Sequence, residues 1–168
     1  MKLFKKMSAL LLLIIFSILA GCSSSSKLPD EMPKDFNFIF SYGVNAKNQL
    51  NTLKGQFTKD MVLEPSVTTN LKLSDEEMKS IYKEMIKINI LSYPDKFEPK
   101  SNMYQTPFYT YSLKIIYNSM EKNIFWEDEN ASKASEAVKL RKLFDNIVQL
   151  IISKDEYKKL PPAKGGYD

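Results

Sequence analysis

The sequence predicts an α+β fold, with a mainly antiparallel sheet of about five strands and two helices packed on one face. Two observations lead to this prediction. Apolar and polar residues alternate in residues 36–42 and 109–117, which is typical of half-buried strands. In residues 78–88 and 137–151 the apolar residues recur every three to four positions, which is typical of amphipathic helices. The predicted order is β-β-β-α-β-β-α.

Three strands are expected before the first helix. Residues 36–42 have an aromatic side chain at every second position, and residues 43–48 are turn-like. Residues 49–62 are predicted to form a second strand with a bulge at Gly55, and residues 67–73 a third strand after Pro65. Short connections between the three favour an antiparallel meander.

The first helix is predicted to begin at a capping box, in which Ser74 and Glu77 each satisfy a backbone N–H of the other residue. It should end before Pro94. One side of this helix is expected to carry an apolar stripe made of Met78, Ile81, Tyr82, Met85 and Ile88.

The second half of the chain predicts a hairpin and a long helix. The hairpin joins residues 109–117 to residues 123–127 through a turn near 118–121. A helix follows from about 132 to about 152. Ser153 and Glu156 have the spacing of a second capping box, so a short helical turn to Leu160 is expected before Pro161 and Pro162. Residues 163–168 are expected to form a tail. The strand aromatics expected in the core are Phe36, Phe38, Phe40, Tyr109, Tyr111 and Trp126.

The first 22 residues have the order of a secretory signal, with lysines at 2, 5 and 6, an apolar run over 7–20, and small residues before Cys22. The sequence Leu19-Ala20-Gly21-Cys22 resembles the lipobox of bacterial lipoprotein precursors. The resemblance implies cleavage between Gly21 and Cys22, and lipid on Cys22 with fatty acids such as palmitate. It predicts a protein anchored at the extracytoplasmic face of the cell membrane, with residues 1–21 as signal peptide.

Two other interpretations of this segment are an uncleaved membrane-spanning helix and a plain secretory signal with an incidental cysteine. About 20 apolar residues are needed to span a bilayer, and Ser8 and Ser17 interrupt a shorter run here. A cysteine directly after two small residues, with no other cysteine in the chain, favours the lipoprotein.

The remaining chain divides into a tether and one domain. Residues 22–35 are rich in serine, proline and charge, and are predicted to be the lipidated cysteine and a flexible tether that reaches about 45 Å at most. Residues 36–168 form one α+β domain, a length that buries a core without disulfides. The element order resembles small uncharacterised α+β domains of Gram-positive lipoproteins, from which no functional residue is carried over.

Composition excludes several classes of function. The signal removes three of the 24 basic side chains, which leaves 21 against 20 acidic ones, a net charge of +1 instead of +4. Arg141 is the one arginine and lysines alternate with acids, so we expect no nucleic-acid partner. The chain has no histidine and no cysteine besides Cys22, which excludes histidine- or thiol-activated catalysis.

We therefore expect no enzyme, no catalytic residues, no cofactor and no metal. The densest acidic run is Glu127-Asp128-Glu129, which lacks the spacing of a calcium loop. It is predicted to be a solvated turn that favours the positive end of the following helix. The function predicted is a non-catalytic binding module. Its alternatives are an envelope enzyme using carboxylate or Tyr/Lys chemistry and a structural protein of envelope assembly.

Residues 92–107 are the candidate interaction site. This stretch has three prolines and no clear period, and long loops in compact domains are often functional. Its aromatic side chains would offer large contact areas to an envelope protein or small ligand. An alternative is that these rings pack back on the sheet. The candidate interaction residues are Tyr93, Phe97, Tyr104 and Phe108.

Overall fold

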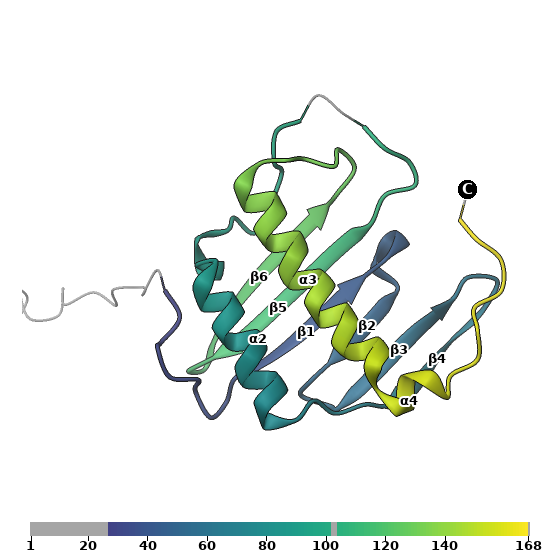
Figure 1. The fold of residues 1–168 in the computed structure, drawn as a ribbon, viewed down its shortest axis with the longest axis horizontal. Helices are drawn as coiled ribbons and strands as arrows, with labels where there is room; N and C mark the ends of the chain where they lie inside the picture. The colour runs from purple at the N-terminus through teal and green to yellow at the C-terminus, as the bar shows by residue number, and fades with distance from the viewer. Residues whose placement is uncertain (1–26, 102–103, 168) are drawn as a thin grey trace, which may run out of the picture.

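Strand β1 lies inside a six-stranded antiparallel sheet with the order β4-β3-β2-β1-β5-β6 (Figure 1). The computed structural model describes residues 27–101 and 104–167. Over those ranges its elements are β1 (Asn37–Tyr42), η1 (Val44–Ala46), β2 (Asn48–Asn51), β3 (Gln56–Met61), β4 (Glu64–Asn70), α2 (Asp75–Lys87), η2 (Ile90–Ser92), β5 (Thr110–Tyr117), β6 (Met120–Glu127), α3 (Ser135–Ser153) and α4 (Asp155–Lys158). The predicted α+β class and antiparallel sheet are confirmed.

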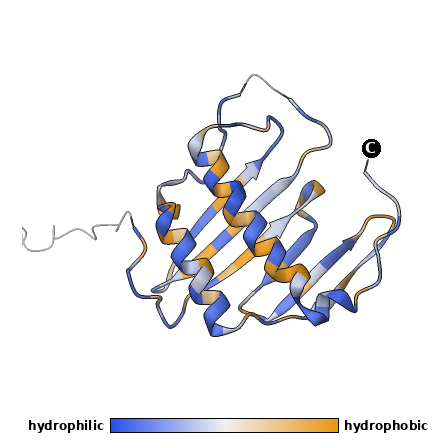
Figure 2. Cartoon of the chain, viewed as in Figure 1, coloured by the Kyte–Doolittle hydropathy of each residue, from blue (hydrophilic) through white to orange (hydrophobic). Residues whose placement is uncertain are grey.

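Helices α2 and α3 cover the same face of the sheet and run in opposite directions (Figure 1). An ion pair between Glu77, in the first turn of α2, and Lys154, at the end of α3, ties two of their ends together at 2.6 Å. Figure 2 shows hydrophobic and hydrophilic segments alternating along α3. The apolar stripe of each helix therefore packs on one face of the sheet. This is expected of amphipathic helices, whose apolar residues recur on one side.

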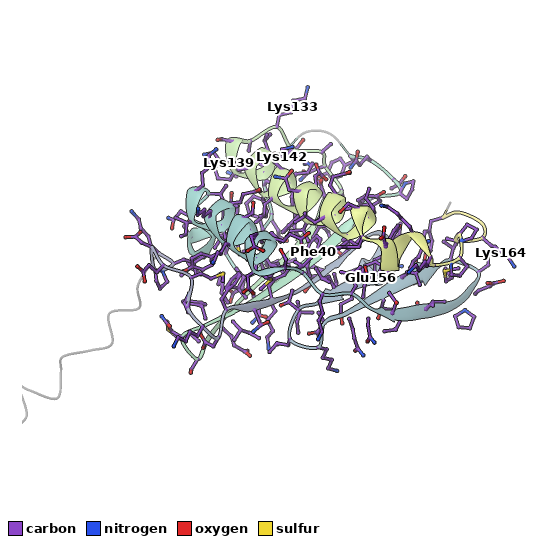
Figure 3. The ribbon with its side chains drawn as sticks, turned by 60° about the horizontal axis from the view of Figure 1, so that its bottom comes forward. Phe40, Lys133, Lys139, Lys142, Glu156 and Lys164 are labelled. Atoms are coloured by element: carbon purple, nitrogen blue, oxygen red, sulfur yellow. The ribbon has the colours of Figure 1, made fainter. Side chains whose placement is uncertain are left out.

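The core between the two layers is built around aromatic rings. Phe144 of α3 has its ring centroid 4.9 Å from Phe40 of β1, 4.9 Å from Tyr111 of β5 and 6.4 Å from Trp126 of β6. All four side chains are buried. Figure 3 shows Phe40 between the helix layer and the sheet. Rings that touch edge-on or offset contribute beyond the area they bury, so this cluster fixes the position of α3 on three strands.

The opposite sheet face carries no described helix and is mostly polar. The strand register aligns one residue from each strand in a row across it, and these six residues are Thr68, Thr58, Gln49, Ser41, Ser112 and Phe125. Short polar contacts cross the row, such as the 2.9 Å hydrogen bond between the hydroxyls of Thr58 and Thr68. Antiparallel sheets commonly leave one such face in water.

Residues 49–62 form two strands, so the prediction of one strand bulged at Gly55 was wrong. The sheet gains a strand over the expected five because the chain reverses at residues 52–55, where the Gly55 N–H donates to the Thr52 carbonyl. Gly55 has φ +59 and lies under Lys72, whose Cγ would be 2.7 Å from an added Cβ. A positive φ and this close approach both favour glycine, and they produce a tight turn.

One of the two predicted capping boxes is confirmed. Glu77 N–H donates to the Ser74 hydroxyl and Ser74 N–H to the Glu77 carboxylate, at 3.3 Å and 2.7 Å. The box predicted at Ser153 was wrong. Its hydroxyl instead donates to the Leu150 carbonyl within α3. The predicted short helical turn does form, as α4, but without a side-chain cap.

The segment expected to be a flexible tether packs on the domain from Leu28 onward, because Leu28 is an apolar side chain that the core can bury. Its side chain is 6 % exposed. The Tyr82 hydroxyl of α2 donates to the Pro29 carbonyl at 2.7 Å. Asp35 accepts from the N–H groups of Asn118 and Ser119 in the β5–β6 turn, which lowers the pKa of its carboxyl. The signal peptide, the cleavage position at Gly21 and Cys22, and residues 23–26 lie outside the described residues.

The aromatic core prediction is confirmed with one exception. Phe36, Phe38, Phe40, Tyr111 and Trp126 are buried, whereas Tyr109 is 56 % exposed. Tyr109 precedes β5, whose first residue is Thr110. Its place at the end of the strand leaves it accessible from solvent.

The packing predicts the cost of removing one ring. We expect Phe144→Ala to lower the free energy of unfolding by about 3–5 kcal/mol, since it leaves a cavity among three aromatic neighbours. Val138, on the same helix, is 50 % exposed. Val138→Ala should therefore change stability by within about 0.5 kcal/mol. Denaturant unfolding of both variants measures this, and equal effects would contradict the role of the aromatic cluster.

Candidate functional site

The loop residues predicted to form an interaction surface fall into two groups. Tyr93 and Phe97 are 4 % and 8 % exposed, so they cannot serve as open contact residues. Tyr104 is 80 % exposed and Phe108 is half-buried. Tyr93 and Phe97 therefore belong to the core, and only Tyr104 and Phe108 of the predicted interaction residues are accessible.

The edge strand β6 explains why Tyr93 and Phe97 are buried. Phe97 N–H donates to the Phe125 carbonyl and Phe125 N–H to the Asp95 carbonyl, both at 2.8 Å, so the loop covers the edge of the sheet. The ring of Phe97 then contacts Trp126 edge-on at 5.2 Å. The Tyr93 hydroxyl donates to the Glu136 carbonyl at 3.0 Å, and burial raises the pKa of Tyr93 to about 12. Covering an edge strand is a common protection against unwanted pairing.

The returning end of the same loop borders a cavity of about 520 Å³. The cavity lies between the start of β5, the connection that follows β6, and α3. Its size is within the range of small-ligand sites. The lining residues are Gln105, Pro107, Tyr109, Tyr111, Asp128, Ala131, Arg141 and Asp145.

One wall of the cavity is an ion pair between the half-buried Arg141 and the buried Asp128. Arg141 donates from Nε and Nη2 to the two carboxylate oxygens of Asp128, at 2.8 Å and 2.9 Å. These hydrogen bonds raise the pKa of Arg141 further. Its guanidinium group lies over the ring of Trp126, 5.1 Å from the centroid. A bidentate pair of this kind holds both side chains in one geometry.

The ion pair corrects the prediction that the acidic run is a solvated turn. Asp128 is only 4 % exposed, whereas Glu127 and Glu129 on either side are exposed. Strand alternation continues to Glu127, and the next residue turns inward to meet α3. The sequence signal that could have found this contact is Arg141 itself, because a lone arginine on a half-buried helix needs an acceptor nearby.

Two polar groups in the cavity, the Tyr111 hydroxyl and the Asp145 carboxylate, have no hydrogen-bond or ion-pair partner among the described residues. Burial, followed by the negative charges of Asp128 and Asp145, raises the pKa of Tyr111, which keeps the phenol neutral. Partial desolvation raises the pKa of Asp145, against the opposing effect of Arg141 and Lys142.

The charges and rings of the cavity define what it can bind. Arg141 neutralises Asp128, so the carboxylate of Asp145 leaves one uncompensated negative charge. Beside it, the rings of Tyr109 and Tyr111 meet edge-on with centroids 6.1 Å apart. The Gln105 amide is held in place by donating to the Asp128 carbonyl at 2.9 Å. An acidic oxygen beside aromatic rings suits a positively charged nitrogen group.

Two further features are absent from the part of the chain that the structure describes. Over 27–101 and 104–167, no three of its histidine, cysteine, aspartate and glutamate side chains lie together as a metal site would need. The helices of those ranges include none with the length and hydrophobicity to cross a membrane.

The sequence matches no model of a known protein family and no curated protein.

The buried ion pair predicts an asymmetric response to mutation. We expect Arg141→Met to lower the free energy of unfolding by about 3 kcal/mol, because it leaves the Asp128 carboxylate buried without its partner. Adding Asp128→Asn should restore part of that loss. Lys158→Met is the control, since its ion pair with Asp155 is exposed and 3.5 Å long. A loss for Arg141→Met no larger than for Lys158→Met, in denaturant unfolding, contradicts the role of the pair.

Proposed function

We propose that this chain is a non-catalytic binding protein, anchored by lipid on Cys22 at the extracytoplasmic face of the cell membrane. The signal-like order of residues 1–22 and the Leu19-Ala20-Gly21-Cys22 sequence support the anchor. The folded domain that packs from Leu28 onward supports a body held close to that anchor. The cavity between β5 and α3 is the proposed binding site.

The proposed ligand carries a positively charged nitrogen group, either as a small amine or as a lysine or arginine side chain of an envelope partner. The observation that carries this is the unpaired Asp145 carboxylate beside the unpaired Tyr111 hydroxyl. Asp145 would accept from the ammonium or guanidinium group, and the Tyr109 and Tyr111 rings would contact its apolar stem.

Binding fits this site better than the alternative of an enzyme with carboxylate or Tyr/Lys chemistry. A tyrosine acting as a base needs a lowered pKa, and here burial and nearby carboxylates raise the pKa of Tyr111. The lining residues include no lysine that could serve as a nucleophile. The polar groups of the cavity are suited to accept and donate hydrogen bonds to a ligand that stays unchanged.

The charge requirement can be tested with a matched pair of probes. We expect Nα-acetyl-lysine methyl ester to bind and its neutral Nε-acetylated form not to bind, in titrations followed by amide NMR shifts. Asp145→Asn should weaken binding about tenfold, because a hydrogen bond to a charged group contributes about 1.5–3 kcal/mol and this one lies at an open rim. Glu136→Gln, an exposed acid of α3 outside the cavity, is the control.

The same titration has an expected pH dependence. Binding requires ionised Asp145, so it is present above the pKa of this group and is lost as the pH falls through it. Because desolvation raises that pKa above the ordinary 3.8, the loss should begin at a higher pH than for an exposed aspartate. Equal binding of both probes, or unchanged binding by Asp145→Asn, would contradict a cation site.

The anchor predicts covalent lipid on one side chain. Cells expressing the full chain and fed an alkyne fatty acid should label the wild type and not Cys22→Ala, because Cys22 is the one thiol in the sequence. Mass spectrometry of the labelled protein should find Cys22 as the first residue. Equal labelling of both forms, or a chain that keeps residues 1–21, excludes this anchor.

A further inference from the structure

A groove of about 390 Å³ lies between the second half of α2 and the first half of α3, on the outer side of the helix layer. Its floor is apolar, formed by Ile88, Leu143 and the half-exposed Val138. Lys87, Lys139 and Lys142 line it as well, together with one acid, Glu84, which accepts a 2.7 Å hydrogen bond from the Asn146 amide. Figure 3 shows Lys139 and Lys142 on the side of α3 that points away from the sheet. An apolar floor with a cationic rim fits a partner that is both anionic and amphiphilic.

The positive charge of the groove continues along α2. Lys79 and Lys83 precede Lys87 at intervals of four residues, which places all three on one side of the helix. All three are exposed, as are Lys139 and Lys142. Over 27–101 and 104–167, no carboxylate lies within ion-pair distance of any of these five lysines. No described ion pair uses their charge, although Asp30 and Glu31 line the same hollow as Lys79 and Lys83.

The amino-terminal segment places this helix layer near the proposed anchor. The Tyr82 hydroxyl of α2 holds the Pro29 carbonyl at 2.7 Å, and Lys79 and Lys83 share a second hollow with residues 30–32. Five residues separate Cys22 from Leu28, so the packed domain begins within about 20 Å of a lipid on Cys22. This step rests on the lipid anchor of the proposed function.

We propose that the outer side of the α2–α3 layer lies on the membrane and binds its anionic lipid headgroups. The five lysines contact the headgroup phosphates, and Val138 with Ile88 faces the apolar boundary below them. The polar sheet face then points away from the bilayer, on the opposite side of the same two-layer fold. The lipid on Cys22 would hold the domain at the membrane, and the lysines would orient it there.

The test uses the mature chain from residue 22 with Cys22→Ala, so that no anchor contributes to binding. It is mixed with vesicles of phosphatidylcholine alone or of phosphatidylcholine with phosphatidylglycerol, and the bound fraction is measured by sedimentation. We expect binding only to the anionic vesicles, and its loss in high salt. The triple variant Lys87→Gln, Lys139→Gln, Lys142→Gln should bind about 100-fold more weakly, because each lysine near the surface contributes about 1 kcal/mol, or about fivefold.

The control is a second set of three exposed lysines, Lys34, Lys54 and Lys72, which line a different hollow beside the β2–β3 turn. Replacing these three by Gln should reduce binding much less. No binding to anionic vesicles at low salt, or equal losses for both triple variants, overturns the membrane-facing orientation. Since the tested chain has no anchor, this result is independent of fatty-acid labelling, which tests the anchor separately.

Discussion

The packing of Phe144 against Phe40, Tyr111 and Trp126 is the interaction on which the rest of this structure depends. Each of the four rings comes from a different element, so the contact fixes the direction of α3 across β1, β5 and β6. About one helical turn separates Arg141 from Asp145, and Phe144 lies between them in the chain. Because α3 is held at Phe144, the Arg141 guanidinium group lies against Asp128 and the Asp145 carboxylate lies at the cavity.

Polar contacts then set the two ends of α3. Arg141 joins Asp128 near its start, and Lys154 joins Glu77 at its end. Ion pairs taken out of water contribute little net stability against their desolvation, but removing one of the two partners is costly. Between them the core contributes the bulk of the stability, and the unused Asp145 and Tyr111 remain free for a ligand. The position of the candidate site is therefore set by the contacts that fix α3 on the sheet.

Local patterns allowed much of the fold to be predicted from the sequence. Alternation identified β1 and β5 because most of their inner residues are buried and most of their outer residues are only half-buried. Ser74 and Glu77 gave the start of α2 because their hydrogen bonds are local. The turn at Gly55 was missed because a glycine between two apolar stretches is compatible with a bulge or a reversal, and only the pairing of β3 with β2 and β4 distinguishes them.

The candidate site was harder to predict because it is made by contacts between distant residues. Tyr93 and Phe97 lie in a proline-rich stretch whose composition is typical of an exposed loop. They are buried because this loop pairs with β6, which the sequence around them does not reveal. Asp128 belongs to an acidic run whose neighbours are exposed, so nothing local marks it as the partner of Arg141, thirteen residues away. Leu28 is one apolar residue in a serine- and proline-rich stretch, and its burial depends on where α2 lies.

The most direct test of this account is a crystal structure of the protein with Nα-acetyl-lysine methyl ester bound. The account predicts α3 in its present position, the ammonium nitrogen about 3 Å from the Asp145 carboxylate, and the aliphatic stem against Tyr109 and Tyr111. A probe bound elsewhere on the protein would contradict it. So would a Tyr109 ring that fills the cavity while Asp145 points into solvent.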